Sequence, residues 1–147
     1  MPSSIRIPLQ VSDSIRPLRG LLDTSVVIDL GVIEPERLPV DVAISAITMA
    51  ELSAGPQATD DLPERARRQA QLQRAESTFD PLAFDTEAAR AYGQVFAAVA
   101  AIGRKPRGAR AADMLIAATA VANGLPLFTR NPKDFDGLSD LVEIFGI

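Results

Sequence analysis

The order of short apolar runs and helical segments constrains the fold of this chain more than any other feature. Segments with the composition of short buried strands are residues 19–23, 42–45, 81–84, 125–129 and 141–145. Helical patterns occupy residues 25–30, 48–52, 60–79, 87–102 and 109–122. Strands that alternate with helices favour a parallel sheet that is covered on both faces. The sequence therefore predicts an α/β fold with a mostly parallel sheet of about five strands.

The chain of 147 residues has the length of a single domain. Residues 1–17 contain Pro2, Pro8 and Pro17 and show no sustained hydrophobic period. We expect an N-terminal extension over residues 1–17, with a short strand near residues 5–11, followed by one domain over residues 18–147. The extension is either a mobile arm or part of an interface.

Composition restricts both the location of the protein and its chemistry. No apolar run approaches the roughly 18–20 residues that a membrane-spanning helix needs, and the first residues lack the apolar core of a signal peptide, so we expect a soluble cytoplasmic protein. The chain contains no cysteine and no histidine. This composition excludes disulfides, thiolate or histidine metal sites, and serine or cysteine nucleophiles activated by histidine. Enzymatic chemistry would have to rest on carboxylates, which with water and phosphates are the ligands of Mg²⁺ and Mn²⁺.

Asp23 follows the first predicted strand directly. Ligands of open α/β sheets bind at the carboxyl ends of the strands, which makes Asp23 a candidate functional acid. The alternative is that Asp23 is only the N-cap of the next helix, since aspartate is among the preferred capping residues. We favour Thr24 or Ser25 for the capping role.

Glu51 lies in the helical segment after the second predicted strand. Thr48 and Glu51 have the spacing of a capping box, which would explain the glutamate locally. Ser45 is an equally good N-cap, and it would place Glu51 one turn further into the helix. The second interpretation leaves Glu51 available for function.

Asp113 lies in a segment, residues 111–122, that is apolar on every side, and such a helix is buried. An unpaired buried carboxylate costs several kcal/mol or is forced to protonate, so Asp113 is expected to have an arginine, a helix terminus or a metal as its partner. The alternative is a charge that is favourable in the first turn of a helix.

Asn131 and Asp134 follow the fourth predicted strand, where Asn131-Pro132 is also a turn signal. Polar groups at this position can bind a cation or a phosphate. Together with Asp23, Glu51 and Asp113 they suggest one cluster of acids. Clustered carboxylates repel each other, so a cluster implies a divalent cation.

The helical segment over residues 60–79 is the most charged part of the chain. We expect an inner stripe and an outward basic face. The stripe is marked by Leu62, Ala66, Ala70 and Leu72 or Gln73, and the outward residues are Arg65, Arg67, Arg68 and Arg74. Those arginines form either a solvated face or a surface for a partner.

Three sequence elements resemble the PIN domain, in particular the toxins of VapBC-type toxin–antitoxin modules. They are Leu-Leu-Asp23-Thr-Ser, Ile-Ser-Ala-Ile-Thr-Met-Ala-Glu51-Leu, and Ala-Ala-Asp113-Met-Leu-Ile-Ala-Ala with Leu-Phe-Thr-Arg-Asn131-Pro-Lys-Asp134-Phe. The resemblance spans residues 20–147. It implies a three-layer α/β/α sandwich and a Mg²⁺- or Mn²⁺-dependent endoribonuclease.

By the same resemblance, Asp23, Glu51 and Asp113 match the first three acidic residues of the family site. Asp23 and Asp113 would hold the metal directly, and Glu51 would act through water. The fourth position is Asn131 here, with Asp134 three residues later, so either residue is a candidate for it.

The resemblance also implies contacts around the metal site and macromolecular partners. Hydroxyl groups of Thr24, Ser25 and Thr129 would support the site or contact phosphate. RNA requires basic contacts, and the candidates in the loop before Asp113 are Arg104, Lys105, Arg107 and Arg110, although that loop could equally be solvated. Family members pair as homodimers and are inhibited by a cognate antitoxin.

Two other functions fit parts of the sequence. A haloacid-dehalogenase-like phosphatase also opens with a strand that ends in aspartate, but it needs a second aspartate two residues later, where this chain has Ser25. The other alternative is a non-catalytic module of the same fold that binds a partner through an acidic groove.

Overall fold

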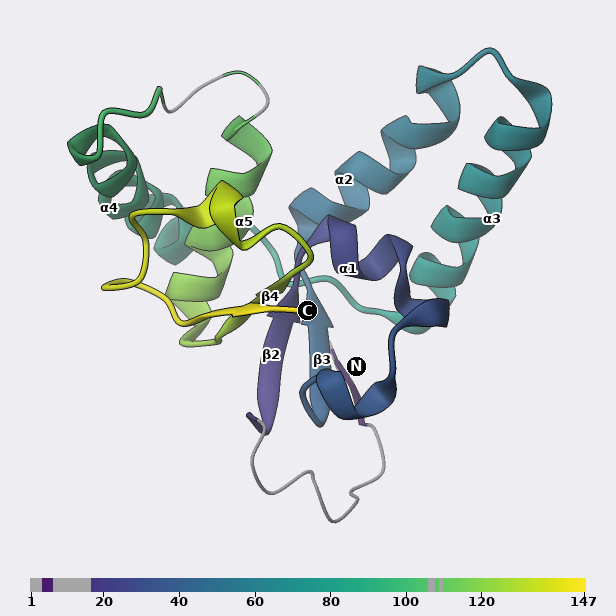
Figure 1. Cartoon of the computed structure of the whole chain (residues 1–147). Coiled ribbons are helices and arrows are strands. Elements are labelled where there is room, and N and C mark those ends of the chain that lie inside the picture. Colours follow the sequence, from purple (N-terminus) through teal and green to yellow (C-terminus); the bar gives the residue numbers. More distant parts are fainter. Residues whose placement is uncertain (1–3, 7–16, 106–107, 109) are drawn as a thin grey trace.

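The computed structural model describes residues 4–6, 17–105, 108 and 110–147, and it contains a five-stranded sheet (Figure 1). The strands, in their spatial order, are β1 (Ser4–Arg6), β3 (Asp41–Ile44), β2 (Arg19–Leu22), β4 (Leu127–Thr129) and β5 (Ile144–Gly146). Strands β3, β2, β4 and β5 are parallel, and β1 is antiparallel to β3. The predicted α/β class with a mostly parallel sheet is confirmed.

Within the described residues, five α-helices connect and cover these strands. They are α1 (Thr24–Ile28), α2 (Ala46–Ala54), α3 (Leu62–Thr78), α4 (Thr86–Ala101) and α5 (Arg110–Asn123). Short 3-10 turns follow, including η2 (Leu30–Val32) after α1 and η5 (Pro132–Phe135) after β4; η3 (Pro35–Arg37) and η4 (Gly55–Ala58) lie in the remaining connections. In the part of the chain that the structure describes, no helix is long and apolar enough to cross a membrane.

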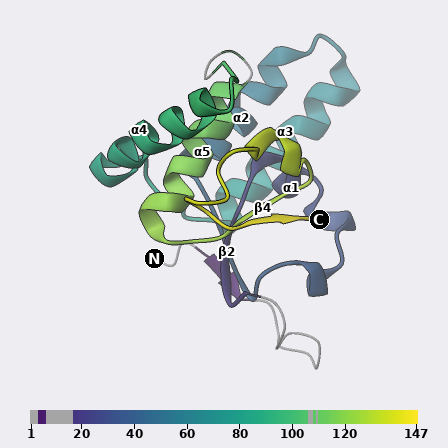
Figure 2. The ribbon, with the colours of Figure 1, turned by 60° about the vertical axis from the view of Figure 1, so that its left-hand side comes forward.

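Adjacent leucines of β2 divide the core into two layers, because successive side chains of a strand point to opposite faces. Leu21 packs in a cluster with α4 and α5, and Leu22 packs in a cluster with α1, α2 and α3. Both leucines have no exposed surface. Figure 2 shows α4 and α5 together over one face of the sheet. This arrangement is the expected three-layer α/β/α sandwich.

Two predicted elements differ from the structure. The predicted strand at residues 81–84 is reduced to one bridge between Ser45 and Leu82, next to Pro81, which has no N–H to donate to a longer ladder. In α3, Leu72 packs inward as expected, but Leu62 is 72% exposed, and Ala75, which was outside the predicted stripe, is buried. Figure 1 shows the reason: the α2–α3 pair projects beyond the sheet, so the start of α3 has no layer to cover.

Residues 4–6 of the predicted N-terminal extension form the edge strand β1, in which Ser4 lies opposite Ala43 of β3. Residues 7–16, where most of the strand near residues 5–11 was expected, lie outside the described part. Three residues of the segment therefore contribute to the sheet, next to a strand that leads to the candidate site.

Candidate active site

Three neighbouring parallel strands deliver the candidate residues to one edge of the sheet. Asp23 follows β2, Ser45 follows β3 at the start of α2, and Thr129 ends β4. Because β2 lies between β3 and β4, the carboxyl ends of these strands are adjacent. Figure 1 shows α1, α2 and the first turn of α5 on this side of the sheet.

Asp23 is 4% exposed and is itself the N-cap of α1. Its Oδ1 atom accepts hydrogen bonds from the Val26 amide at 3.1 Å and from the Ser25 hydroxyl at 2.6 Å. The prediction that Thr24 or Ser25 caps this helix is therefore wrong. The Asp23 carboxylate is the N-cap, because it reaches the unpaired amide of Val26, and the Ser25 hydroxyl donates to that carboxylate. Burial raises the pKa of Asp23, and hydrogen bonds from the Ser25 and Thr129 hydroxyls oppose that rise.

Ser25 and Thr129 also connect Asp23 to the segment after β4. The Ser25 hydroxyl accepts from the Arg130 amide at 3.0 Å, and the Thr129 hydroxyl accepts from the Asn131 amide at 3.0 Å. Both hydroxyls are thus oriented by backbone amides, which leaves their protons to donate to Asp23. The predicted supporting positions of Ser25 and Thr129 fit this geometry.

Glu51 is exposed on α2 and is held from α1. Ser45 caps α2 by accepting from the Thr48 amide at 3.1 Å, so Glu51 lies beyond the first turn and outside a capping box. The Glu51 Oε1 atom lies 2.5 Å from the Thr24 hydroxyl. Thr24 therefore contacts one carboxylate of the candidate site and is adjacent in sequence to another.

Asp113 is half-buried and lies in the first turn of α5. This is the position expected under the alternative to a functional role. Burial raises the pKa of Asp113 to about 7, with further increases from the charges of Asp134, Asp23 and Glu51 and a decrease from Arg110. A first-turn position alone would favour the charged carboxylate. The opposite shift comes first from the burial of Asp113, and the negative charges of Asp134, Asp23 and Glu51 add to it, so these three acids lie near enough to repel the charge of Asp113.

The described residues contain no group of three or more acids placed to hold a metal ion by themselves. Mg²⁺ is commonly bound by one or two carboxylates together with waters and substrate phosphates, so the donor set fits such an ion. The charges of Asp134, Asp23 and Glu51 add to the effect of burial on the pKa of Asp113, and a cation would neutralise these negative charges. Asn131 and Asp134 are both exposed at the rim, and which of them is the fourth residue stays a prediction.

The basic residues predicted to contact RNA differ in how free their side chains are. Arg104 donates to the Lys133 carbonyl at 2.9 Å and to the Asp136 carboxylate at 3.1 Å, so its guanidinium is engaged within the fold. Lys105 is exposed, and Arg110 lies close enough to Asp113 to lower its pKa. Arg107 lies outside the described residues.

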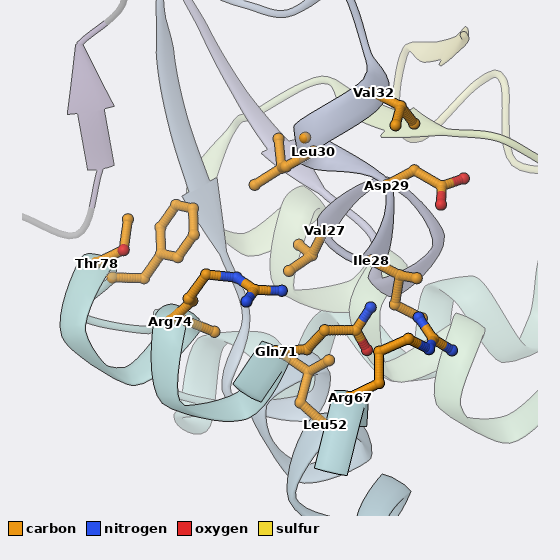
Figure 3. A pocket seen from close by; sticks show the side chains of 13 residues that line it. Val27, Ile28, Asp29, Leu30, Val32, Leu52, Arg67, Gln71, Arg74 and Thr78 are labelled. Atoms are coloured by element: carbon orange, nitrogen blue, oxygen red, sulfur yellow. The ribbon is translucent and has the colours of Figure 1, made fainter. Parts of the chain in front are cut away.

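A groove between α1–η2 and α3 was not predicted from the sequence. It encloses about 590 Å³, and its apolar lining includes Val27, Leu52 and Phe79. Figure 3 shows Arg67 and Arg74 of α3 beside the side chains of α1 and η2. A smaller adjoining cavity of about 300 Å³ shares residues with this groove and is lined by Thr24 and Glu51.

The groove therefore adjoins the candidate active site. The only sequence signal for it was the charged face of the long helix, which we interpreted as a solvated face or a partner surface. Its apolar wall includes Ile28 and Val32, which are 42% and 78% exposed. The spacing of hydrophobic residues in the sequence does not distinguish such exposed apolar side chains from core residues.

Comparison with known proteins places this architecture in a family. A model of the PIN domain matches residues 20–141. Ribonuclease VapC5 of Mycobacterium tuberculosis is 32% identical over 134 residues, which cover 89% of this chain and 96% of that protein. VapC ribonuclease Y4jK of Sinorhizobium fredii is 34% identical over 131 residues, which cover 79% and 89% of the two proteins.

Solved structures give the same result. A chain of the VapBC-5 toxin–antitoxin structure from Mycobacterium tuberculosis matches with a TM-score of 0.74 at 32% identity, covering 89% of this chain and all (100%) of that chain. A chain of DNA-bound VapBC from Salmonella typhimurium matches with a TM-score of 0.68 at 28% identity, covering 88% and 98%. The sheet order, the acids at its carboxyl edge and these matches agree, and the chain belongs to the PIN domain family.

Proposed function

We propose that this chain is a Mg²⁺- or Mn²⁺-dependent endoribonuclease that acts as the toxin of a toxin–antitoxin pair. The observation that carries the proposal is the buried carboxylate of Asp23 at the carboxyl edge of the sheet, which the Ser25 hydroxyl contacts at 2.6 Å. Its charge, with those of Asp134 and Glu51, adds to the burial that raises the pKa of Asp113 to about 7. Two relatives named as VapC ribonucleases support the reaction class. The PIN domain match leaves the phosphatase alternative without support.

In this mechanism Asp23 and Asp113 would hold the cation, with Asn131 or Asp134 completing the site. A bound divalent cation supplies charge for the phosphodiester oxygens and lowers the pKa of a coordinated water. Ser25 and Thr129 orient the Asp23 carboxylate through the hydrogen bonds described above. Glu51, oriented by Thr24, would accept a proton from the attacking water.

Substrate phosphates need cationic contacts near these acids. Arg110 fits this role, because it lies close to Asp113 and at the start of α5. Lys105 is a further candidate, and Arg107 stays a prediction from the sequence, whereas Arg104 would first have to leave Asp136. The substrate class that this arrangement serves is single-stranded RNA.

The test compares RNA cleavage by the wild type and the Asp23→Asn variant, with Mg²⁺, with Mn²⁺ and with EDTA. Asparagine caps a helix as well as aspartate does, so the fold should survive while cleavage falls by about 100-fold or more. Asp85→Asn is the matched control, since Asp85 caps α4 in the same way but lies outside the site. Equal cleavage by wild type and Asp23→Asn, or cleavage that EDTA does not reduce, would overturn the metal-dependent mechanism. A wild type that neither cleaves RNA nor binds the metal would leave the non-catalytic alternative.

The same proposal includes an antitoxin that binds the groove between α1–η2 and α3, and a homodimeric toxin. The groove is apolar at its base, and the described residues offer no ion-pair partner for the Arg74 guanidinium at its edge. An antitoxin segment with apolar side chains and a carboxylate would match both features. Arg74→Glu should weaken the toxin–antitoxin complex about 10-fold or more, whereas Arg90→Glu, which alters a pair on α4, should not.

A further inference from the structure

Thr48 is a fully buried polar residue beside the candidate active site that the proposed mechanism does not use. Its side chain has no exposed surface. Its hydroxyl lies 3.0 Å from the Thr24 hydroxyl and 3.5 Å from the Ser45 hydroxyl. The shorter contact crosses from α2 to α1, between residues 24 positions apart.

The orientation of Thr48 differs from that of other hydroxyl residues on the helices. Thr119, which is equally buried, donates to the Leu115 carbonyl at 2.9 Å within α5. Ser53 donates to the Met49 carbonyl at 2.8 Å within α2. These are the usual bonds to the carbonyl four residues earlier. Thr48 instead contacts another helix, at the residue that follows Asp23.

The direction of the hydrogen bonds follows from the number of protons. Thr24 has one hydroxyl proton, and its closest acceptor is the Glu51 carboxylate at 2.5 Å. A charged acceptor makes the stronger bond, so Thr24 donates to Glu51. The Thr48 hydroxyl must then donate to Thr24. The result is a chain of two hydrogen bonds that runs from the buried Thr48 through Thr24 to Glu51.

We propose that Thr48 is a positioning residue that holds Glu51 in its working orientation through Thr24. Glu51 is exposed, and its long side chain can adopt several rotamers. The Thr48 side chain is instead fixed by burial, and the Thr48 amide is bound by the cap at Ser45. The fixed residue therefore restricts Thr24, and Thr24 restricts the carboxylate. The catalytic meaning of this inference rests on the proposed ribonuclease function.

The test uses Thr48→Val, which keeps the shape and removes the hydroxyl, and Thr48→Ser, which keeps the hydroxyl. We expect Thr48→Val to lower kcat for RNA cleavage roughly 10- to 100-fold with little change in KM, because an exposed carboxylate that wanders by about 1 Å loses its catalytic alignment. Thr48→Ser should recover most of the rate. Thr24→Val combined with Thr48→Val should be no slower than Thr24→Val alone, since both changes break one chain of contacts.

Thr119→Val is the matched control, because it also removes a buried threonine hydroxyl but leaves the site intact. It should reduce stability about as much as Thr48→Val while leaving kcat unchanged. A crystal structure of Thr48→Val gives a second readout that does not need activity: Glu51 Oε1 should lie beyond hydrogen-bond distance of Thr24 Oγ1.

The outcomes separate the two proposals. An active wild type with Thr48→Val equally active overturns the positioning role and leaves the ribonuclease intact. An inactive wild type overturns the ribonuclease, and the crystal structure then decides the inference, which fails if Glu51 stays bonded to Thr24. If Thr48→Val does not fold, Thr48→Ala removes the same hydroxyl. It should likewise lower kcat and move Glu51 beyond hydrogen-bond distance of Thr24.

Discussion

At the scale of single residues, Asp23 shows how one carboxylate serves both the fold and the candidate site. It caps α1 through Oδ1 and receives the Ser25 hydroxyl on the same atom. The two explanations that the sequence left open, helix cap and functional acid, are therefore compatible. An N-cap also places a carboxylate where helix amides and a bound cation can both reach it.

Asp113 gives a prediction on stability and pH. Its pKa is about 7 in the folded protein and lies near its ordinary value of 3.8 in the unfolded chain. The folded state therefore holds a proton that the unfolded state has released between pH 4 and 7, so this group stabilises the protein at low pH and loses that contribution as the pH rises through 7. The contribution is lost before pH 8.

Asp113→Asn should accordingly stabilise the metal-free protein at pH 8. Water screens a half-buried carboxylate, and a first-turn charge is slightly favourable, so we expect a gain of about 1 kcal/mol. The advantage should shrink steadily from pH 7 to pH 4. Urea unfolding at several pH values measures it, and a variant less stable than the wild type at pH 8 would contradict the repulsion that we describe.

Added Mn²⁺ should favour the wild type over Asp113→Asn, which is the reverse of the order of stability expected without metal. A cation that binds only the folded state stabilises it, so the wild type should gain stability with Mn²⁺ and Asp113→Asn should gain much less. The Asp85→Asn control, which leaves the four acids in place, should respond as the wild type does. These comparisons separate loss of repulsion from loss of metal binding.

At the scale of elements, two glycines have opposite structural roles. A Cβ atom on Gly20 in β2 would lie 2.5 Å from the Phe128 ring, which is buried and stacks on Phe145 with ring centroids 4.9 Å apart. A Cβ atom on Gly93 in α4 would have no neighbour within 4 Å. The strand therefore needs its glycine for packing, whereas the helix does not.

Gly20→Ala should destabilise the protein by about 1–3 kcal/mol, because the Phe128 ring cannot move away cheaply. Gly93→Ala should stabilise it by about 0.5–1 kcal/mol through helix propensity. Thermal unfolding of both variants against the wild type measures the two effects. A Gly20→Ala variant as stable as the wild type would contradict the close packing of β2 against Phe128, and a Gly93→Ala variant less stable than the wild type would contradict the open position on α4.

At the scale of the whole molecule, the two core layers share one sheet. Leu21 and Leu22 are neighbours in sequence but belong to different clusters, on opposite faces of β2. A disturbance of one layer therefore moves a strand that also supports the other. We expect the described domain to unfold as one cooperative unit.

Leu22→Ala tests this coupling. The change should cost about 2–5 kcal/mol on the face covered by α1, α2 and α3. Tyr92, the single tyrosine in a chain without tryptophan, packs in the opposite layer, so its fluorescence reports that layer alone. The midpoint by Tyr92 fluorescence and the midpoint by far-UV circular dichroism should fall together. Separate midpoints would show two independent layers.

The sequence by itself determined the features that depend on neighbouring residues. Strands that alternate with helices predicted the parallel sheet, and acids after strand ends predicted the edge at which Asp23 and Glu51 lie. The cap at Ser45 was also foreseen as one of two choices. Each of these follows from periodicity, turn chemistry or capping within a few positions, and such local preferences are encoded in short stretches.

Only the tertiary structure decided how distant segments meet. The bond from Thr24 to Glu51, the engagement of Arg104 by Asp136, and the groove beside α3 all join residues that the chain separates widely. Local preference carries no information on such pairs. They depend on the order of strands in the sheet and on the way in which each helix packs against it, and these are properties of the folded core as a whole.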